Sequence, residues 1–278
     1  MEIIINNLTY KIEDKTIIPY FDTVIKDNQI TSIIGPAGSG KTTILKILAQ
    51  LVKINDGEMY YDNVLITKKS KKKTINEITK NIGLVFQSTW DQVYNLKVIN
   101  ELKFSLKGSK LNNDEKMQWI NEIIDVFKID KELLDKNPFE IGQCNLRKVA
   151  LASIVLKKPK LLLLDEPTAG LDYESKKNLA KILKNLKRNY ETTIVIASND
   201  VDFLNYVSDE IIVMKQGRVI ASGPKLDVFK KEEYLNNNGI KTPKIISFEN
   251  LVYNEKNIKI GYRDDVNDLL KDIFRYAK

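Results

Sequence analysis

The chain has 278 residues, of which 43% are hydrophobic and 29% charged, and its formal net charge at pH 7 is +7. This composition is typical of a globular protein and excludes a largely disordered chain. No apolar run approaches the roughly 18 residues of a membrane-spanning helix, and the first residues lack a signal-peptide pattern. We therefore expect any role at a membrane to depend on partner proteins. The single cysteine, Cys144, rules out an intrachain disulfide and fits a reducing compartment.

The densest basic segment is residues 68–73, which holds five lysines and one serine. Such a run favours either contact with nucleic acid or anionic lipid, or a plain solvated loop. No aromatic platform and no nucleic-acid-binding motif lies beside it. We therefore expect a solvated loop and no nucleic-acid partner.

The first third of the chain predicts strands separated by polar turns. Its first eleven residues alternate apolar and polar side chains in the manner of an edge strand. A short apolar run, residues 30–34, predicts a buried strand, and residues 43–49 after the following glycine-rich turn predict a helix. Two further strands are expected at 58–61 and 82–86.

Residues 92 to 158 favour helices instead. Met117, Ile120, Ile124 and Phe127 fall on one face of an amphipathic helix. A second helix is predicted over 145–157. The segment therefore predicts a helical block of about 60 residues inserted into the surrounding fold.

Alternation of strands and helices resumes after the helical block. We expect a strand over 160–164, a helix over 173–188 and a strand over 192–197. This order predicts a mostly parallel sheet that is covered on both faces. The tail beyond residue 240 has a separate strand-and-helix pattern, whose final helical face carries the apolar residues Val266, Leu269, Leu270 and Ile273.

Residues 35–42 fit the phosphate-loop pattern G-x-x-x-x-G-K-[ST] at every position, between a predicted strand and a predicted helix. Glycines allow the backbone to wrap phosphates, and the helix N-terminus adds partial positive charge. Lys41 is expected to reach the β- and γ-phosphates, and Thr42 to supply a hydroxyl to Mg²⁺. The expected nucleotide-binding residues are Gly35, Pro36, Ala37, Gly38, Ser39, Gly40, Lys41, Thr42 and Thr43.

Two carboxylates follow the apolar strand at residues 161–164. Asp165 at the strand end is suited to hold Mg²⁺, and Glu166 is placed to polarise the water that attacks the γ-phosphate. An apolar run that ends in Asp-Glu is weak on its own. Together with a complete phosphate loop it predicts an ATP-hydrolysing site.

Residues 165–172, Asp-Glu-Pro-Thr-Ala-Gly-Leu-Asp, resemble the joined Walker B motif and D-loop of ABC ATPases. Gln87 stands where that family keeps its Q-loop glutamine, a ligand of Mg²⁺ and water that senses the membrane partner. The resemblance covers about residues 1–235, and it implies that Asp172 contributes to the nucleotide site. It also implies an α/β P-loop NTPase of ABC type, with a mixed sheet core, an inserted helical subdomain (about 88–158) and a small C-terminal α/β extension.

A narrower likeness is to the ATPases of energy-coupling factor (ECF) importers of vitamins and other micronutrients. It depends on Pro138-Phe139-Glu140, on the spacing after Gln87 and on the segment 239–243 with its final helix. The likeness implies a cassette over 1–238, a dimerisation extension over 239–278, and a location on the cytoplasmic face of the cell membrane. It also implies three kinds of partner: a paralogous ATPase, a transmembrane coupling protein and substrate-binding membrane proteins. Because the substrate-binding proteins are separate subunits, this chain does not reveal the substrate.

Three departures from the family pattern bear on activity. The signature Leu-Ser-Gly-Gly-Gln aligns with residues 141–145, Ile-Gly-Gln-Cys-Asn, which lack the serine hydroxyl and replace two glycines with bulkier residues. The switch histidine aligns with Asn199, which can donate a hydrogen bond but carries no charge. The aromatic residue that stacks on adenine aligns with Ile12, with Tyr10 nearby.

Two hypotheses explain these departures: sequence drift with function kept, or a subunit that binds ATP well and hydrolyses it poorly. The loss of one phosphate-facing donor costs about 10²–10³ in rate. A homodimer would combine both lesions at each site, so we predict an obligate heterodimer. An ATPase of another ABC transporter, a non-hydrolysing ATP-binding scaffold and a nucleic-acid-binding ATPase stay as alternatives.

Overall fold

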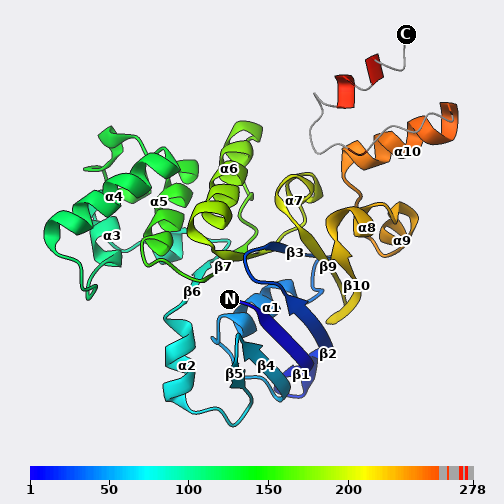
Figure 1. Ribbon diagram of the computed structural model, residues 1–278, viewed down its shortest axis with the longest axis horizontal. Coiled ribbons are helices and arrows are strands. Elements are labelled where there is room, and N and C mark those ends of the chain that lie inside the picture. The colour runs from blue at the N-terminus through cyan, green and yellow to red at the C-terminus, as the bar shows by residue number, and fades with distance from the viewer. Residues whose placement is uncertain (257–261, 263–268, 272, 275–278) are drawn as a thin grey trace.

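The computed structural model describes residues 1–256, 262, 269–271 and 273–274, and it contains two β-sheets (Figure 1). The smaller sheet is antiparallel, with the strand order β2-β1-β4-β5. Its strands are β1 (Ile3–Ile12), β2 (Lys15–Ile25), β4 (Asp56–Tyr61) and β5 (Val64–Ile66). The prediction of an edge strand at the N-terminus was wrong, because β1 pairs with β2 on one side and β4 on the other. Alternation of side chains indicates which face is buried, and does not reveal whether both edges are paired.

The larger sheet has six strands in the order β10-β9-β3-β8-β7-β6. Neighbouring strands are parallel except for the β9–β10 pair, which confirms the predicted mostly parallel arrangement. The predicted strand positions are confirmed to within one or two residues. The strands are β3 (Ile30–Ile34), β6 (Ile82–Val85), β7 (Leu161–Asp165), β8 (Thr193–Ala197), β9 (Glu210–Lys215) and β10 (Arg218–Pro224).

Helices cover both faces of this larger sheet, so every residue of β3, β7 and β8 is buried. Alternate residues of β7 enter different cores. Leu162 and Leu164 pack with the helical block and α6, whereas Leu161 and Leu163 pack with α1 and the smaller sheet. The continuous leucine run follows from this double burial.

Ten α-helices complete the described fold, and α3, α4 and α5 form a lobe of their own at the left of Figure 1. This lobe confirms the inserted helical block. The helices are α1 (Lys41–Leu48), α2 (Lys72–Thr79), α3 (Val98–Ser105), α4 (Asn113–Phe127), α5 (Gln143–Val155), α6 (Tyr173–Tyr190), α7 (Val201–Val207), α8 (Lys225–Phe229), α9 (Glu232–Asn237) and α10 (Lys244–Lys256). Short 3₁₀ turns span Trp90–Gln92, Lys131–Leu133 and Pro138–Glu140.

The predicted amphipathic helix is α4. Asn112 and Glu115 form a reciprocal capping box at its start, which satisfies two backbone donors. Of the predicted stripe, Ile120, Ile124 and Phe127 are buried, and Met117 packs partly buried against the same core.

The described part of the tail is helical. The strand predicted there is not found among residues 240–256, and Val266 lies outside the described residues. Leu269 is buried, whereas Leu270 is exposed. Of the helices described, none is long and apolar enough to cross a membrane.

Candidate active site

The site lies at the carboxyl ends of three neighbouring parallel strands. β8 lies between β3 and β7 in the sheet. The phosphate loop follows β3, Glu166 follows β7, and Ser198 follows β8. Loops after adjacent parallel strands meet at one edge of the sheet, and this edge is where ligands bind in such folds. The topology therefore brings together residues that lie far apart in the sequence.

Two glycines of the phosphate loop, Gly35 and Gly40, lie where other parts of the chain approach closely or where the backbone favours glycine. A Cβ on Gly35 would lie 2.2 Å from the carbonyl oxygen of Met214, so no larger residue fits. Gly40 has φ 102, a conformation that favours glycine, and it directly precedes α1. The first turn of α1 has no capping side chain and no acidic residue. Its free N–H groups make this helix start suited to an anion.

Lys41 is buried at the start of α1 and turns its ammonium into the loop. Its Nζ donates to the carbonyl oxygens of Gly35 at 2.6 Å and Pro36 at 3.2 Å. Burial lowers the pKa of Lys41, and the carboxylates of Glu166 and Asp165 partly oppose that shift. The cation therefore lies where a bound phosphate would compensate its charge.

Thr42 and Asp165 provide adjacent oxygen donors. The Thr42 hydroxyl donates to Asp165 Oδ2 at 2.9 Å and Oδ1 at 3.2 Å. Burial raises the pKa of Asp165, and the hydrogen bond from Thr42 opposes the shift. Hard oxygen donors suit Mg²⁺, which usually keeps several waters and phosphate oxygens. Within the described residues, no cluster of three acidic, histidine or cysteine side chains could hold a metal ion.

Glu166 leaves β7 through an unusual backbone conformation. Its φ is 44, in the left-handed region, while its N–H still donates to the Ala197 carbonyl at 2.8 Å. Its carboxylate Oε2 accepts hydrogen bonds from Ser198 Oγ at 2.7 Å and from the Asn199 N–H at 3.4 Å. Strained backbone often occurs at functional sites. Ser198, which holds the carboxylate of the predicted base, was not predicted from the sequence.

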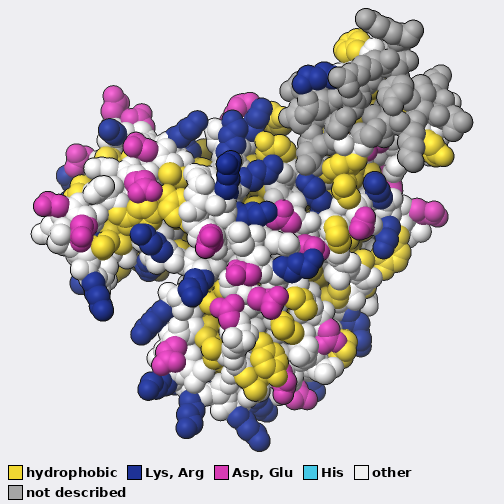
Figure 2. Space-filling model, in the orientation of Figure 1, with side chains coloured by type: hydrophobic (Ala, Val, Ile, Leu, Met, Phe, Trp, Pro, Cys, Tyr) yellow, Lys and Arg dark blue, Asp and Glu magenta, His cyan; other side chains and the backbone are white. Residues whose placement is uncertain are grey.

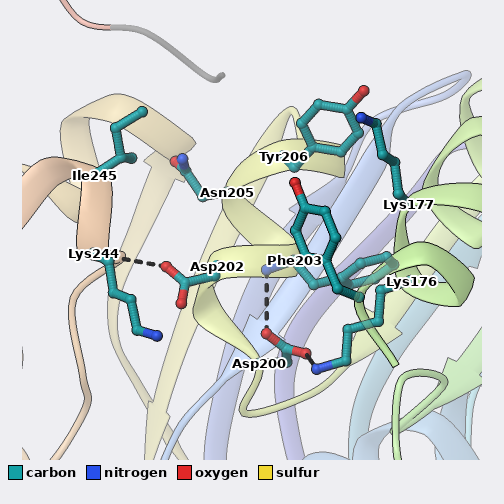
Figure 3. A pocket seen from close by; sticks show the side chains of 10 residues that line it. Lys176, Lys177, Asp200, Asp202, Phe203, Asn205, Tyr206, Lys244 and Ile245 are labelled. Carbon is teal, nitrogen blue, oxygen red and sulfur yellow. Dashed lines mark hydrogen bonds and ion pairs between the residues drawn. The ribbon is translucent and has the colours of Figure 1, made fainter. Parts of the chain in front are cut away.

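The segment after β8 is held by interactions with α6 and α7. Asp200 caps α7 by accepting from the Phe203 N–H at 3.2 Å, and it pairs with Lys176 of α6 at 2.6 Å (Figure 3). These residues line a cavity of about 430 Å³ between α6, α7 and the start of α10. No phosphate-loop residue lines this cavity. The two interactions of Asp200 hold the chain directly after Asn199.

The signature positions lie at the start of α5. Gly142 has φ 79, and α5 begins at Gln143 with no capping side chain. The side chains of Gln143, Cys144 and Asn145 are directed toward this chain's own atoms. Gln143 packs against Gly170, Cys144 Sγ lies 3.2 Å from Ser175 Oγ, and Asn145 Nδ2 donates to the Ile141 carbonyl.

A family model described as "ABC transporter" matches residues 21–169, which is more than half of the chain. The chain belongs to the ABC transporter family. Two of its relatives are named energy-coupling factor transporter ATP-binding protein EcfA2. The one from Caldanaerobacter subterraneus is 33% identical over 89% of this chain and 87% of the relative. The one from Staphylococcus aureus is 32% identical over 82% of this chain and 80% of the relative.

Solved structures are also similar to this ABC ATPase. The cbiO1 protein of Clostridium perfringens, described as part of the ABC transporter complex cbiONQ, is 29% identical with a TM-score of 0.77, over 88% of this chain and 97% of that one. The bacterial cassette MJ0796 in its dimeric structure is 25% identical with a TM-score of 0.71, over 80% and 98%. The predicted ABC-type fold and the family assignment are confirmed.

Gln87 of this ABC ATPase opens a segment with several side-chain anchors. Gln92 accepts from the Phe86 N–H and donates to the Leu84 carbonyl, both at 2.9 Å, so that it covers the free edge of β6. The buried carboxylate of Glu101 accepts three hydrogen bonds from Tyr94 and Asn95. The Gln87 side chain is exposed next to these anchors.

The other predicted site residues have contacts of their own outside the phosphate loop. Asp172 caps α6 by accepting from the Ser175 N–H at 2.8 Å, and this hydrogen bonding lowers its pKa. Ile12 is 51% exposed, whereas Tyr10 packs partly buried against the smaller sheet's core. Asp172 stays a prediction as a nucleotide ligand, and no adenine-stacking residue is assigned.

Proposed function

We propose that this ABC ATPase energises an ECF-type importer of vitamins or other micronutrients from the cytoplasmic face of the membrane. The observation that carries the proposal is the convergence of Lys41, Thr42, Asp165 and Glu166 at one sheet edge. The ECF assignment is supported by similarity to proteins named EcfA2 that extends over about nine tenths of the chain.

The proposed mechanism assigns separate tasks to the converging residues. The N–H groups at the start of α1 and the Lys41 ammonium bind the ATP phosphates. Thr42, Asp165 and Gln87 would hold Mg²⁺, which would neutralise phosphate charge. Glu166, oriented by Ser198, takes the proton of the attacking water. Asn199 donates a hydrogen bond near the γ-phosphate, where a histidine would add charge.

Exposed apolar side chains after Gln87 support a contact with a membrane coupling protein. Trp90 stacks on Phe139 with ring centroids 5.4 Å apart, and both rings remain partly exposed. Tyr94 and Leu96 are 77% and 78% exposed, and Phe104 on α3 is also exposed. Apolar side chains gathered near one segment favour a protein contact. Figure 2 shows basic and acidic side chains interspersed over the visible face.

The tail supports the proposed pairing with a paralogous ATPase. Phe248, Leu251 and Tyr253 on α10 are exposed, as are Leu270 and Phe274 further along. These side chains need a partner surface to be removed from water. We therefore keep the assignment of residues 239–278 to dimerisation.

A second candidate function is that of a regulatory ATP binder whose paralogue does the chemistry. The observation that favours it is the loss of the signature serine at Gly142 together with Asn199 at the switch position. Both leave the phosphate loop complete, so binding is retained while turnover falls.

The test of the proposed function combines the purified chain, its paralogous ATPase and a membrane coupling protein in detergent or lipid. We expect ATP-dependent phosphate release by the pair, and retention of the chain on membranes only when the coupling protein is present. Tyr94→Asp with Leu96→Asp should abolish retention without changing turnover in solution. Membrane retention that is independent of the coupling protein would contradict the proposal.

Deletion of residues 240–278 tests the pairing. We expect the dissociation constant of the ATPase pair to rise by about tenfold or more, since exposed apolar contacts are lost. An unchanged dissociation constant would rule out a dimerisation role for the tail.

A further inference from the structure

Arg147 on α5 joins three functional segments of the chain. Its side chain is only 2% exposed. One guanidinium nitrogen donates to the Glu166 carbonyl at 3.0 Å and the other to the Gln87 carbonyl at 3.4 Å. A single side chain therefore connects the helix behind the signature loop to the main chain at both the base and the Q-loop glutamine.

The charge of Arg147 is buried without an acidic partner. No carboxylate of the described residues lies within 4.0 Å of the guanidinium, and its Nε has no hydrogen-bond partner. Burial lowers the pKa of Arg147. An unpaired buried charge is costly, and a well-packed apolar side chain would often serve stability as well or better. An arginine at this buried position therefore points to a role beyond packing.

The two carbonyls that Arg147 contacts belong to residues whose direction matters for hydrolysis. The N–H of Glu166 donates to the Ala197 carbonyl of β8, and its own carbonyl accepts from the Ala169 N–H at 3.1 Å. Arg147 adds a second, side-chain hydrogen bond to that carbonyl and so ties this turn, with Glu166 at φ 44, to α5. That backbone conformation sets where the carboxylate points. The second bond holds the start of the segment that carries Gln87.

We propose that Arg147 is a positioning residue for ATP hydrolysis, which fixes the main chain at Glu166 and Gln87 relative to the signature helix. This inference rests on the proposed function. In a pair, the signature helix of one chain faces the nucleotide on the other. Arg147 thus provides a physical link through which nucleotide at the opposite site affects this chain's own base.

Hydrogen exchange of the purified single chain tests the positioning directly. We compare Arg147→Met and Arg147→Gln with Lys148→Met, a matched control because Lys148 is the next residue and its ammonium donates to the Lys128 carbonyl, away from Glu166 and Gln87 in the sequence. Both Arg147 variants should accelerate amide exchange in the segments 86–89 and 166–169 by about tenfold or more, at unchanged melting temperature within a few degrees. Exchange as slow as in the control would overturn the inference. Arg147→Gln keeps the test valid if Arg147→Met does not fold.

Turnover of the ATPase pair gives the second readout. We expect Arg147→Met to lower kcat by about 10- to 100-fold, because small misplacements of catalytic groups have effects of this size. KM and the nucleotide affinity should change by less than about threefold. Arg147→Lys should restore part of kcat, since one ammonium can reach one carbonyl. A loss of nucleotide affinity equal to the loss of kcat would overturn the inference, whereas an inactive wild-type pair would instead count against the proposed function.

Discussion

The phosphate-loop side and the signature side of this ABC ATPase differ in how fully they keep the family's chemistry. On the phosphate-loop side, every residue of the phosphate loop is present, as are Asp165 and Glu166, and these groups follow buried parallel strands, although Asn199 replaces the switch histidine. On the signature side, at the start of α5, the hydroxyl-bearing residue is Gly142, and the side chains of Gln143 and Cys144 contact this chain's own Gly170 and Ser175.

The difference teaches which half of an ATP site a subunit must supply itself. Each site in an ABC pair combines one chain's phosphate loop with the other chain's signature. A paralogue can therefore compensate for an altered signature, but it cannot replace this chain's own loop. Bulk in place of the two signature glycines would hinder the close approach of a phosphate. In the structure, however, residues 143–145 are helical and their side chains point back onto the same subunit. The lost serine hydroxyl is then the main chemical deficit.

The largest expected effect tests the intact side. Lys41→Ala should abolish measurable ATP binding, or weaken it by well over tenfold, which corresponds to at least about 1.4 kcal/mol. Nucleotide titration of the purified variant measures this effect, with Lys46→Ala on the same helix as control. An unchanged ATP affinity of Lys41→Ala would show that the phosphate loop does not bind ATP as proposed.

The next effect asks which site of the pair is productive. Glu166→Gln in this subunit alone should lower ATP turnover of the heterodimer by about 10²-fold, because the site that combines Glu166 with the partner's signature loses its base. The partner's equivalent substitution should cost less. If turnover survives nearly intact, the productive site is the other one and this chain is chiefly a regulatory ATP binder.

A smaller effect is expected from repair of the altered side. Gly142→Ser should raise turnover of the pair by up to about tenfold, which is less than the full value of a phosphate-facing donor. Serine is strained at φ 79, although a Cβ there would meet no neighbouring atom. Gly142→Ala introduces the same strain without the hydroxyl, and an equal gain from both variants would refute the proposed role of the hydroxyl.

The smallest effect concerns the stability of the intact side. Asp165 has a raised pKa, so its burial destabilises the folded protein at pH values where it is charged. This penalty is fully present at neutral pH and disappears as the pH falls through the pKa values of the folded and unfolded states. Asp165→Asn should raise the melting temperature at pH 7.5 by about 2 °C, with a gain that shrinks toward pH 4. If the gain in melting temperature instead grew as the pH fell, the assigned effect of Asp165 burial on stability would be wrong.

Much of the fold and site was predictable because the signals were local. Apolar runs predicted β3, β7 and β8, and the loop and carboxylate motifs at their ends predicted the site. Boundaries were less certain: α1 begins at Lys41, because the last two motif residues already form helix. The N-terminal strand was misplaced at an edge, since pairing depends on strands distant in sequence.

Ser198 and Arg147 were missed for a different reason, because each acts through a contact that no local pattern encodes. Ser198 is a polar residue at the end of an apolar strand, beside the strand that leads to Glu166. Arg147 is one of only five arginines in a lysine-rich chain, and it lies within an apolar helical run. Arginine among lysines indicates a need for planar, two-pronged hydrogen bonding. The residue types of Ser198 and Arg147 were visible in the sequence, but their contacts with Glu166 became visible only in the folded structure.

The position of the only thiol has a practical consequence for watching this enzyme work. Cys144 lies half-buried in the first turn of α5, on the surface that the proposed partner must approach. A thiol-reactive fluorophore would therefore attach at one place without engineered cysteines. Its emission and its quenching by added iodide would report closure and reopening of the pair in real time. The altered signature thus supplies a built-in optical sensor that the usual glycine would not offer.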